Sequence, residues 1–521
     1  MTLRLFLALA AVLSILRLPS LVQPMGADQG LYAYVGERIL EGDVPYRDAW
    51  DQKPPAIHYT YALMRAVWPR DSVVAAADLV AAAIASWLLY RLGAVFAGTA
   101  AGGAAGLVFL LLSNPTFTRL GGVRLRAQCE TFIAAAVTAA FLLIVLPRGS
   151  RIAARMVGAG ALLGLAFAYK YNAGIYSVVA VAALIVTRQL TMANLTRLAA
   201  GFAIPVALLG LVLTATGSLD DAYHATISYN VQYSGETYEG PAHFVTYLLT
   251  FPIERARVDA LWTVAGAGSL VLLAGAFKDW RRLFAPLWVA AACLSIAVNG
   301  SRGLPQYFIQ ANPALGLAAG WGAILVWQWM RTALSVRAAQ VAGVAACLLV
   351  AVGVWRVNQF PKLLEQTAFD LQRMLGRIDA RAHLSRYADE RKYSAIGMKQ
   401  LADYLRAHSA PSDVVYVFGF SPGTYVTADR ESASRFFWSR PVIVGFNADQ
   451  PGYGVDGLLD SLRQRPPAVI ALQRHDWAPD VADSAEFFMS TPELAGWLRS
   501  EYEHDSGPEE FEVWRRKSVH P

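Results

Sequence analysis

The chain of 521 residues is 55% hydrophobic and only 16% charged, and its mean hydropathy is +0.36. Soluble domains carry about 25% charged residues, so the composition excludes an ordinary soluble enzyme and predicts a polytopic membrane protein. The net charge of +6 comes from arginines between apolar runs, which form no single basic face for nucleic acid. The cysteines, Cys129, Cys293 and Cys347, lack metal-ligand spacing, so we expect neither a disulfide framework nor a zinc site.

The N-terminal segment, residues 1–20, has a short basic start and an apolar middle. Both a cleaved signal peptide and a first membrane helix have this pattern. No small-residue cleavage signal precedes the charged segment that follows, which favours an uncleaved membrane anchor.

Apolar windows long enough to cross a hydrocarbon core of roughly 30 Å recur along the chain. They cover residues 3–21, 72–91, 93–113, 131–146, 157–169, 173–187, 198–216, 259–276, 283–298, 313–330 and 338–355. We therefore expect about eleven spans. The windows at 131–146 and 157–169 are short, and the segment around Lys170 has the pattern of a broken or re-entrant span.

Basic residues between the windows predict the orientation of the chain. If the N-terminus is cytoplasmic, the cytoplasmic connections contain Arg91, Arg148, Arg151, Arg155, Arg188, Arg197, Lys278, Arg281, Arg282, Arg331 and Arg337. The alternate loops at 22–71, 114–130, 217–258 and 299–312 mix acids, aromatics and prolines instead. We therefore predict a multi-pass protein of the plasma (inner) membrane, with these four loops on the extracytoplasmic side.

The composition becomes that of a soluble domain after Trp355. Short apolar runs at 413–418 and 468–472 predict buried strands, and helical patterns at 394–408 and 454–464 precede them. This repeated order of helix and strand predicts a small α/β domain.

The predicted fold class is thus a polytopic α-helical membrane protein with a small C-terminal extracytoplasmic α/β domain. Residues 1–355 form the predicted transmembrane domain, with residues 22–71 as its main outer loop, and residues 356–521 form the soluble domain.

The first outer loop, residues 22–71, concentrates charge in an otherwise apolar chain, and charge at a membrane is costly to place without a function. Helical patterns at 31–40 and 57–68 are too short and too polar to span, so they predict two helices lying in the membrane interface. Such helices would hold Asp28 and Lys53 at the mouth of the helix bundle, which suits a substrate lying half in lipid.

Asp28 and Lys53 are the candidate functional residues of this loop. Asp28 follows the first span, where a carboxylate can act as a general base toward an acceptor hydroxyl or amine. A solvated loop acid is the plain alternative. Lys53 precedes Pro54 and Pro55, whose fixed φ angles stiffen the chain and present the ammonium rigidly to a phosphate. A snorkelling lysine at lipid headgroups is the alternative here.

Further candidates lie in the later loops. Arg124 has a guanidinium suited to a phosphate leaving group, and Glu130, at the start of a span, supplies a second carboxylate or orients an arginine. Lys170 lies between two apolar windows, so it needs an anion, an aqueous cavity or a headgroup. Gln306 and Tyr307 have side chains that bind sugars, but they equally fit an ordinary aromatic belt.

Three motifs after the first span carry a family resemblance: Gly26-Ala-Asp-Gln-Gly-Leu-Tyr-Ala-Tyr34, Gly42-Asp-Val-Pro-Tyr46 and Asp51-Gln-Lys-Pro-Pro55. Together they resemble the bacterial branch of the protein O-mannosyltransferase superfamily, to which aminoarabinose transferases also belong. These are membrane glycosyltransferases of the C-type fold, similar to glycosyltransferase family 39, that take sugar from a polyprenyl-phosphate carrier. The resemblance extends to residues 302–320, similar to a late tyrosine-bearing loop, and 393–516, similar to the extracytoplasmic domain.

The resemblance implies roles for four residues. Asp28 matches the family's first-loop acid, the catalytic base, and Lys53 matches the lysine that contacts the carrier phosphate. Glu130 falls where members place a second acid, and Lys170 resembles a basic residue with a phosphate role.

Two positions depart from the family pattern. Gln29 stands where many members have Glu, which weakens the case for a paired-carboxylate or metal site. Gln306 stands where relatives often have His, which leaves the acceptor contacts open.

The sequence therefore predicts an inverting glycosyltransferase with Asp28 and Glu130 as its catalytic acids. Asp28 activates the acceptor, Glu130 is the second acid, and Lys53, Lys170 and Arg124 stabilise the departing phosphate. The residues expected to contact sugar or acceptor are Asp51, Tyr32, Tyr307 and Gln306. Phosphate is a good leaving group, so no cofactor is required; a divalent metal is compatible with the site but not indicated.

The predicted partners are a polyprenyl-phosphate sugar donor, an acceptor that is a lipid, glycan or protein, and membrane lipids. A transporter or flippase of lipid-linked sugars and a glycan ligase or polymerase are the alternative functions. Transporters tend to have inverted repeats and polar residues at mid-membrane depth, whereas here the acids lie in outer loops and no repeat is visible.

Overall fold

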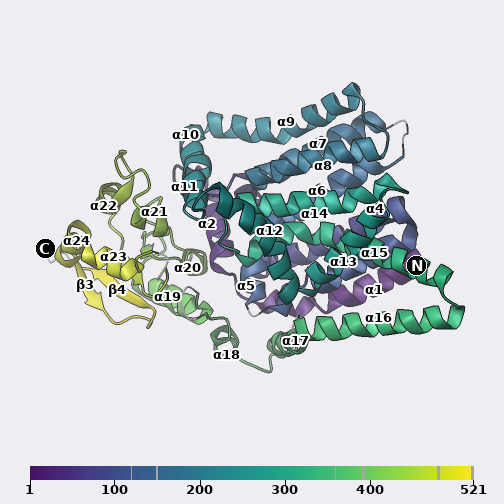
Figure 1. Cartoon of the computed structure of the whole chain (residues 1–521). Helices are drawn as coiled ribbons and strands as arrows, with labels where there is room; N and C mark the ends of the chain where they lie inside the picture. Colours follow the sequence, from purple (N-terminus) through teal and green to yellow (C-terminus); the bar gives the residue numbers. More distant parts are fainter. Residues whose placement is uncertain are drawn as a thin grey trace. The chain divides into compact units, whose positions relative to one another are not determined.

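The computed structural model describes residues 1–118, 120–147, 149, 151–357, 360–389, 393–477 and 481–517, so Arg148 lies outside the described residues. The described chain is mostly helical, with one small sheet near the C-terminus (Figure 1). It divides into two compact units. The helical unit comprises Met1–Leu21, Ala75–Val212 and Val231–Leu371, and the loop–tail unit comprises Val22–Val74, Leu213–Asn230 and Gln372–Pro521.

The helical unit is built from long apolar helices joined by short turns. Its elements are α1 (Leu3–Ile15), η1 (Leu18–Val22), α4 (Ser72–Leu112), η2 (Pro115–Phe117), α5 (Gly121–Leu125), α6 (Cys129–Val145), α7 (Ile152–Tyr169), η3 (Tyr171–Ile175), α8 (Tyr176–Val186), α9 (Met192–Ala215), α12 (Pro241–Val258), α13 (Ala260–Ala274), η5 (Trp280–Leu283), α14 (Phe284–Val298), η6 (Pro305–Ala311), α15 (Asn312–Ala333), α16 (Val336–Val357) and α17 (Phe360–Met374).

Every predicted apolar window falls on one of these helices. Among the described residues, seven helical segments are long and apolar enough to cross a membrane, or up to eight if α12 and α13, which are bent by 119°, form one span. The protein is therefore a polytopic helical membrane protein, as predicted. The number of eleven spans and the orientation of the chain stay predictions.

Helix α4 contains two predicted windows, and its backbone explains how. Gly98 has φ +84°, which breaks the helix in the middle. The two backbone segments that flank the break pack closely against each other: a Cβ added to Gly93 would lie 2.6 Å from the Gly102 Cα. The Ser86 hydroxyl also donates to the Gly106 carbonyl at 2.9 Å. The two halves of α4 are therefore antiparallel helices in a hairpin, which only a residue tolerant of positive φ permits at the bend.

The loop–tail unit contains shorter elements. They are α2 (Ala27–Glu41), α3 (Ala56–Val67), α10 (Leu219–Tyr223), η4 (His224–Ser228), α18 (Ala380–Ser385), α19 (Ala395–His408), β1 (Tyr416–Phe418), α20 (Gly423–Ala428), α21 (Arg440–Ile443), α22 (Gly454–Gln464), β2 (Val469–Gln473), α23 (Ser484–Ser490), α24 (Pro492–Glu501), β3 (Tyr502–Asp505) and β4 (Phe511–Arg516). Helix α11 (Tyr229–Gly235) begins in this unit, but its residues from Val231 on belong to the helical unit. Both predicted loop helices are confirmed as α2 and α3, and the predicted strands and their preceding helices are confirmed as β1, β2, α19 and α22.

The small sheet has the strand order β1-β2-β4-β3. Strand β1 runs parallel to β2, with Tyr416 opposite Ile470, whereas β4 pairs antiparallel with both β2 and β3. Both β1 and β2 are fully buried along their length, which explains why they are continuous apolar runs in the sequence. The predicted small α/β domain is therefore present in the tail.

Within the loop–tail unit, the first loop packs directly on the tail. Helix α2 touches α20 so closely that a Cβ on Gly30 would lie 2.6 Å from the Gly423 nitrogen. The Tyr34 hydroxyl accepts a hydrogen bond from the Ser432 amide at 2.9 Å, and the Trp438 indole donates to the Trp50 carbonyl at 3.1 Å. The first loop and the tail thus belong to one compact unit. The domain boundary predicted at residue 355 stays a prediction.

We expect Gly30→Ala to destabilise the loop–tail unit, because its new methyl group would collide with backbone that cannot rotate away. Overpacking of this kind typically costs about 1–3 kcal/mol. The matched control is Gly423→Ala in the same contact, whose methyl group would meet the Gly30 Cα at 3.6 Å and the Met398 Sδ at 3.7 Å, both at ordinary van der Waals distances. Thermal unfolding in detergent should give a lower midpoint for Gly30→Ala alone, and equal midpoints for the two variants would contradict the packing argument.

Candidate active site

Asp28 lies in the first turn of α2, whose N-cap residue is Gly26. The amide of Gly26 donates to the Gln29 side-chain oxygen at 2.7 Å, so Gln29 satisfies one of the open donors at the helix start. A carboxylate in the first turn is stabilised by the positive end of the helix dipole. Asp28 is half-buried. Gln29, which stands where many members of the resembled family have Glu, therefore has a structural role: its side chain fixes the turn that carries Asp28.

Asp51 and His58 form a buried pair next to this turn. The Asp51 Oδ2 lies 3.2 Å from the His58 Nε2, and both side chains are almost completely buried. Burial raises the pKa of Asp51 to about 7, with Lys53 opposing the shift and the charge of Asp28 adding to it. Burial lowers the pKa of His58 to about 3. The imidazole is therefore neutral at neutral pH, and the carboxyl is only partly ionised.

Lys53 is held by hydrogen bonds to the backbone around it. The Tyr46 hydroxyl donates to the Lys53 carbonyl at 2.8 Å, and the Asn230 amide donates to the Gln52 carbonyl at 2.7 Å. Pro54 follows, and is buried, while Lys53 itself is half-buried. Since Lys53 also lowers the pKa of Asp51, its ammonium lies near that carboxyl. The structure thus brings Asp28, Asp51 and Lys53 together in the loop–tail unit.

Tyr32 lies in the core of the same unit. Its side chain is buried, and its ring packs edge-on against Tyr61 at 5.4 Å and beside His58 at 6.3 Å between ring centroids. This aromatic packing holds His58, which is the partner of Asp51. A direct contact of Tyr32 with sugar or acceptor stays a prediction.

Three further acids of the loop form ion pairs with arginines. Glu37 pairs with Arg65, with its Oε1 accepting from the arginine Nε at 2.8 Å. Asp43 accepts from the Arg38 Nε at 2.6 Å. The Asp48 Oδ2 lies 2.7 Å from the Nη2 of Arg47.

The helical unit holds a second cluster of predicted site residues. The Lys170 ammonium donates to the Glu130 carboxylate at 2.6 Å, and both side chains are buried. The ammonium also lies 4.5 Å from the centroid of the Tyr307 ring, in a cation–π contact. Glu130, Lys170 and Tyr307 are therefore brought together, although they come from three distant segments of the chain.

The chain around Lys170 is broken, as its sequence predicted. Helix α7 ends at Tyr169, Lys170 is extended with φ −156°, and the 3-10 turn η3 precedes α8. The Asn172 amide donates to the Ser295 carbonyl at 2.8 Å, which ties this break to α14. The break therefore lies inside the protein, where irregular backbone finds hydrogen-bond partners.

A buried hydrogen-bond network missed by the sequence analysis supports Tyr307. The Gln310 oxygen accepts from the Tyr176 hydroxyl at 3.0 Å and from the Ser295 hydroxyl at 2.8 Å, and the Gln310 amide donates to the Tyr307 carbonyl at 3.2 Å. Gln310 lies in the predicted outer loop 299–312, where a polar side chain is ordinary, so the sequence carried no signal for this network. Gln306, next to Tyr307, is half-buried.

The second outer loop places its arginines differently. Arg124 is exposed on the short helix α5, whereas Arg126 is buried with its Nη1 3.6 Å from the Asp78 Oδ2. The sequence analysis missed Asp78, although an acid within the apolar window at 72–91 is a functional or structural marker.

Metal-ligand geometry is not found in the described parts of the chain, where no three His, Cys, Asp or Glu side chains converge on one point. The absence of a cofactor requirement stays a prediction.

We expect Asp51 and His58 to give opposite pH dependences of stability. Between about pH 4 and 7 the folded protein holds more protons on Asp51 than the unfolded chain, so this group makes stability fall as pH rises. Between about pH 3 and 6.5 the folded protein holds fewer protons on His58, so this group makes stability rise with pH. The two slopes oppose each other in the wild type.

Thermal midpoints in detergent across this range would separate the two groups. In Asp51→Asn the midpoint should rise with pH, because only His58 still titrates. In His58→Gln it should fall with pH, because only Asp51 still titrates. The charges of Lys53 and Asp28 are present in both variants. If both variants keep the pH profile of the wild type, neither group titrates as described.

Comparison with known proteins defines the fold. No protein-family model matches the chain, and no curated protein matches it significantly. The structure is similar to that of ArnT from Cupriavidus metallidurans bound to undecaprenyl phosphate, with a TM-score of 0.59, 16% identity, and coverage of 99% of this chain and 98% of that one. The apo form of the same protein gives a TM-score of 0.54 at 16% identity, with coverage of 98% and 97%.

A second similar structure is the oligosaccharyltransferase AglB from Archaeoglobus fulgidus, in complex with an inhibitory peptide and a dolichol-phosphate. It has a TM-score of 0.53 at 12% identity, and the match covers 99% of this chain and 75% of that one. At these identities the similarity defines the fold alone. The chain therefore has the C-type glycosyltransferase fold that its sequence predicted.

Proposed function

We propose that the protein is a membrane glycosyltransferase that moves a sugar from a polyprenyl-phosphate donor to an extracytoplasmic acceptor with inversion. One observation carries the proposal: a helix-start carboxylate, Asp28, and a rigidly held lysine, Lys53, lie around the same buried acid, Asp51. The fold supports it, because the structures it resembles hold undecaprenyl phosphate and a dolichol-phosphate.

Asp28 is the proposed general base. It removes the proton from the acceptor hydroxyl or amine as that atom attacks the anomeric carbon. The bond between the anomeric carbon and the phosphate oxygen breaks, and its electron pair leaves with the carrier phosphate. Asp51 is buried beside His58 and Gln29 carries no charge, whereas Asp28 is only half-buried at the helix start, so Asp28 is the acid of this region best placed to accept the proton.

Lys53 is the proposed partner of the carrier phosphate. The residue is half-buried, and its backbone is fixed by Tyr46, Asn230 and the proline pair. A fixed positive charge stabilises the phosphate more as negative charge develops on the leaving oxygen, so it lowers the barrier as well as binding the donor.

Lys170 and Arg124 keep their proposed roles in phosphate stabilisation, and Glu130 orients Lys170. The Lys170 ammonium has three N–H donors; one binds Glu130, and we propose that another binds an oxyanion of the phosphate. Tyr307 and Gln306 are proposed to contact sugar or acceptor, as are Asp51 and Tyr32 in the loop–tail unit. In this proposal the N-terminus is cytoplasmic and the chemistry is extracytoplasmic, with no metal required.

We expect Asp28→Asn to reduce transfer about 10²- to 10⁴-fold, because removal of a general base has effects of this size. The assay supplies membranes with labelled polyprenyl-phosphate sugar and measures covalent product. Glu41→Gln is the matched control, since Glu41 lies on the same helix, is exposed and pairs with Arg38. Undiminished transfer by Asp28→Asn would exclude it as the base, and sugar transport without any covalent product would favour a transporter.

We expect Lys53→Gln to lose both donor affinity and rate, with kcat/KM for the donor falling at least about tenfold through loss of a charge-assisted contact. The control Arg47→Gln removes a cation of the same loop whose guanidinium pairs with Asp48. Donor binding measured separately should persist in Asp28→Asn and weaken in Lys53→Gln. Unchanged donor binding in Lys53→Gln would remove the phosphate role.

A further inference from the structure

Both peptide planes that flank Lys53 are held by side chains from outside its own segment. The Asn230 side-chain amide donates to the Gln52 carbonyl at 2.7 Å, on the N-terminal side of Lys53. The Tyr46 hydroxyl donates to the carbonyl of Lys53 itself at 2.8 Å, on the C-terminal side. A peptide unit is planar, so a hydrogen bond to its carbonyl restrains the whole plane. The two bonds together therefore restrain the backbone on either side of the Lys53 Cα.

Tyr46 has a backbone conformation that is unfavourable for an aromatic residue. Its φ is +71°, in the left-handed region, where a residue with a Cβ is crowded. Its amide donates to the Ala49 carbonyl at 2.8 Å, and its ring is completely buried and packs edge-on against His58 at 5.8 Å between centroids. Strain of this kind persists where the surrounding structure enforces it, often at functional sites. Here the strained residue delivers its hydroxyl to the Lys53 carbonyl.

Asn230 reaches the first loop from a helix that contains a π turn, η4. The Tyr229 amide donates to the carbonyl five residues earlier. A π turn contains one residue more than an α turn, so the side chains after it are rotated by about 100°. Both residues that follow this turn contact the first loop: the Tyr229 ring packs edge-on against Trp50 at 5.0 Å, and Asn230 binds the Gln52 carbonyl. Asn230 also donates to the Thr226 carbonyl at 2.8 Å in its own helix, which orients its amide.

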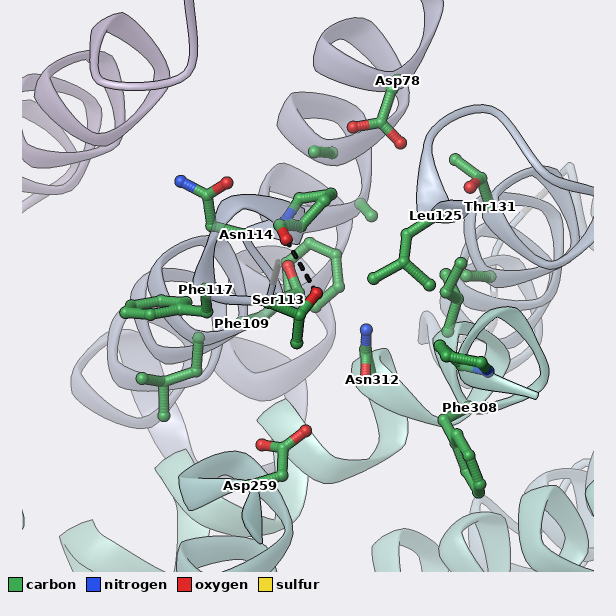
Figure 2. A pocket seen from close by; sticks show the side chains of 18 of the residues that line it. Asp78, Phe109, Ser113, Asn114, Phe117, Leu125, Thr131, Asp259, Phe308 and Asn312 are labelled. Carbon is green, nitrogen blue, oxygen red and sulfur yellow. Dashed lines mark hydrogen bonds between the residues drawn. The ribbon is translucent and has the colours of Figure 1, made fainter. Parts of the chain in front are cut away.

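These contacts of Lys53 are separate from the cavity of about 380 Å³ in the helical unit. Every residue that lines this cavity belongs to the helical unit, and its polar side chains include Asp78, Asn114 and Asp259 (Figure 2). Tyr46, Asn230 and Lys53, in contrast, all belong to the loop–tail unit. The restraint on Lys53 therefore arises within one compact unit.

We propose that Tyr46 and Asn230 are positioning residues for the carrier phosphate and that they act through Lys53. Neither side chain has to touch the donor. Because they fix two peptide planes before the donor arrives, the Lys53 backbone loses less conformational entropy when the phosphate binds. This role rests on the proposed contact between Lys53 and the phosphate, and it adds the two residues that make this contact rigid.

Titration of the full-length protein in detergent with undecaprenyl phosphate tests the proposal. Tyr46→Phe and Asn230→Ala each remove hydrogen-bond donors to the backbone around Lys53 and leave its ammonium in place. Each variant should weaken binding about two- to tenfold, the usual effect of one hydrogen bond.

Two matched controls remove polar contacts of the same segments that do not involve Lys53. Tyr34→Phe removes a buried hydroxyl of the first loop, which accepts from the Ser432 amide at 2.9 Å. Asp221→Asn weakens the ion pair of α10 with Arg435, whose Nη1 lies 3.0 Å from the carboxylate. Both controls should bind undecaprenyl phosphate like the wild type, even where their thermal midpoints fall.

Combination with Lys53→Gln separates positioning from a general loosening of the unit. If the two residues act through Lys53, adding Tyr46→Phe or Asn230→Ala to Lys53→Gln should cause little further loss, because effects on one shared interaction are not additive. A fully additive loss would overturn the proposal. Tyr46→Phe removes a single oxygen atom, so it keeps the test decisive if Asn230→Ala fails to fold.

The outcomes also separate this proposal from the catalytic one. Weak binding by Lys53→Gln together with wild-type binding by Tyr46→Phe and Asn230→Ala would overturn the positioning role and leave the phosphate role of Lys53 intact. Wild-type binding by Lys53→Gln would overturn that phosphate role, and the positioning role with it.

Discussion

The structure depends on how a mostly apolar chain compensates the few charges that it buries. An ion removed from water is stable only beside an opposite charge or several well-placed dipoles. Lys170 meets Glu130 at 2.6 Å, and Arg126 meets Asp78 at 3.6 Å. Each pair joins segments that are far apart in the sequence, so each helps to fix which helices are neighbours. A buried pair also positions its members, and this makes a compensated charge available for chemistry.

The loop–tail unit solves a different problem, which is to hold a long loop in one conformation. A loop of this length has many conformations unless other segments pack on it. Here the tail does so through backbone contact at Gly30 and Gly423 and through hydrogen bonds to Tyr34 and Trp50. The aromatic cluster around Trp50, which includes Tyr229, Phe436 and Trp438, fills the space between three segments of the chain. Order in the Asp28 and Lys53 region therefore comes from residues hundreds of positions away.

Much of the fold follows from local patterns, and the sequence predicted those parts. Apolar windows gave the helices because the length of an apolar run is itself the signal, and α2, α3, β1 and β2 followed from periodicity and composition. The hairpin in α4 did not follow, since it depends on the positive φ of Gly98 and on close contacts across the bend. The pairing of Asp51 with His58 and the network around Gln310 depend on tertiary placement, which no local pattern encodes.

The burial of Asp51 beside His58 explains why the proposed mechanism uses one catalytic base. If Asp51 were fully ionised, its charge would neutralise that of Lys53. Burial instead raises the pKa of Asp51 to about 7, so much of its charge is absent where a phosphate would approach Lys53. An arriving phosphate adds negative charge near Asp51 and favours its protonated form further. In the proposed mechanism Lys53 then acts on the phosphate and Asp28 on the acceptor, while the neutral Gln29 fixes the turn that carries Asp28.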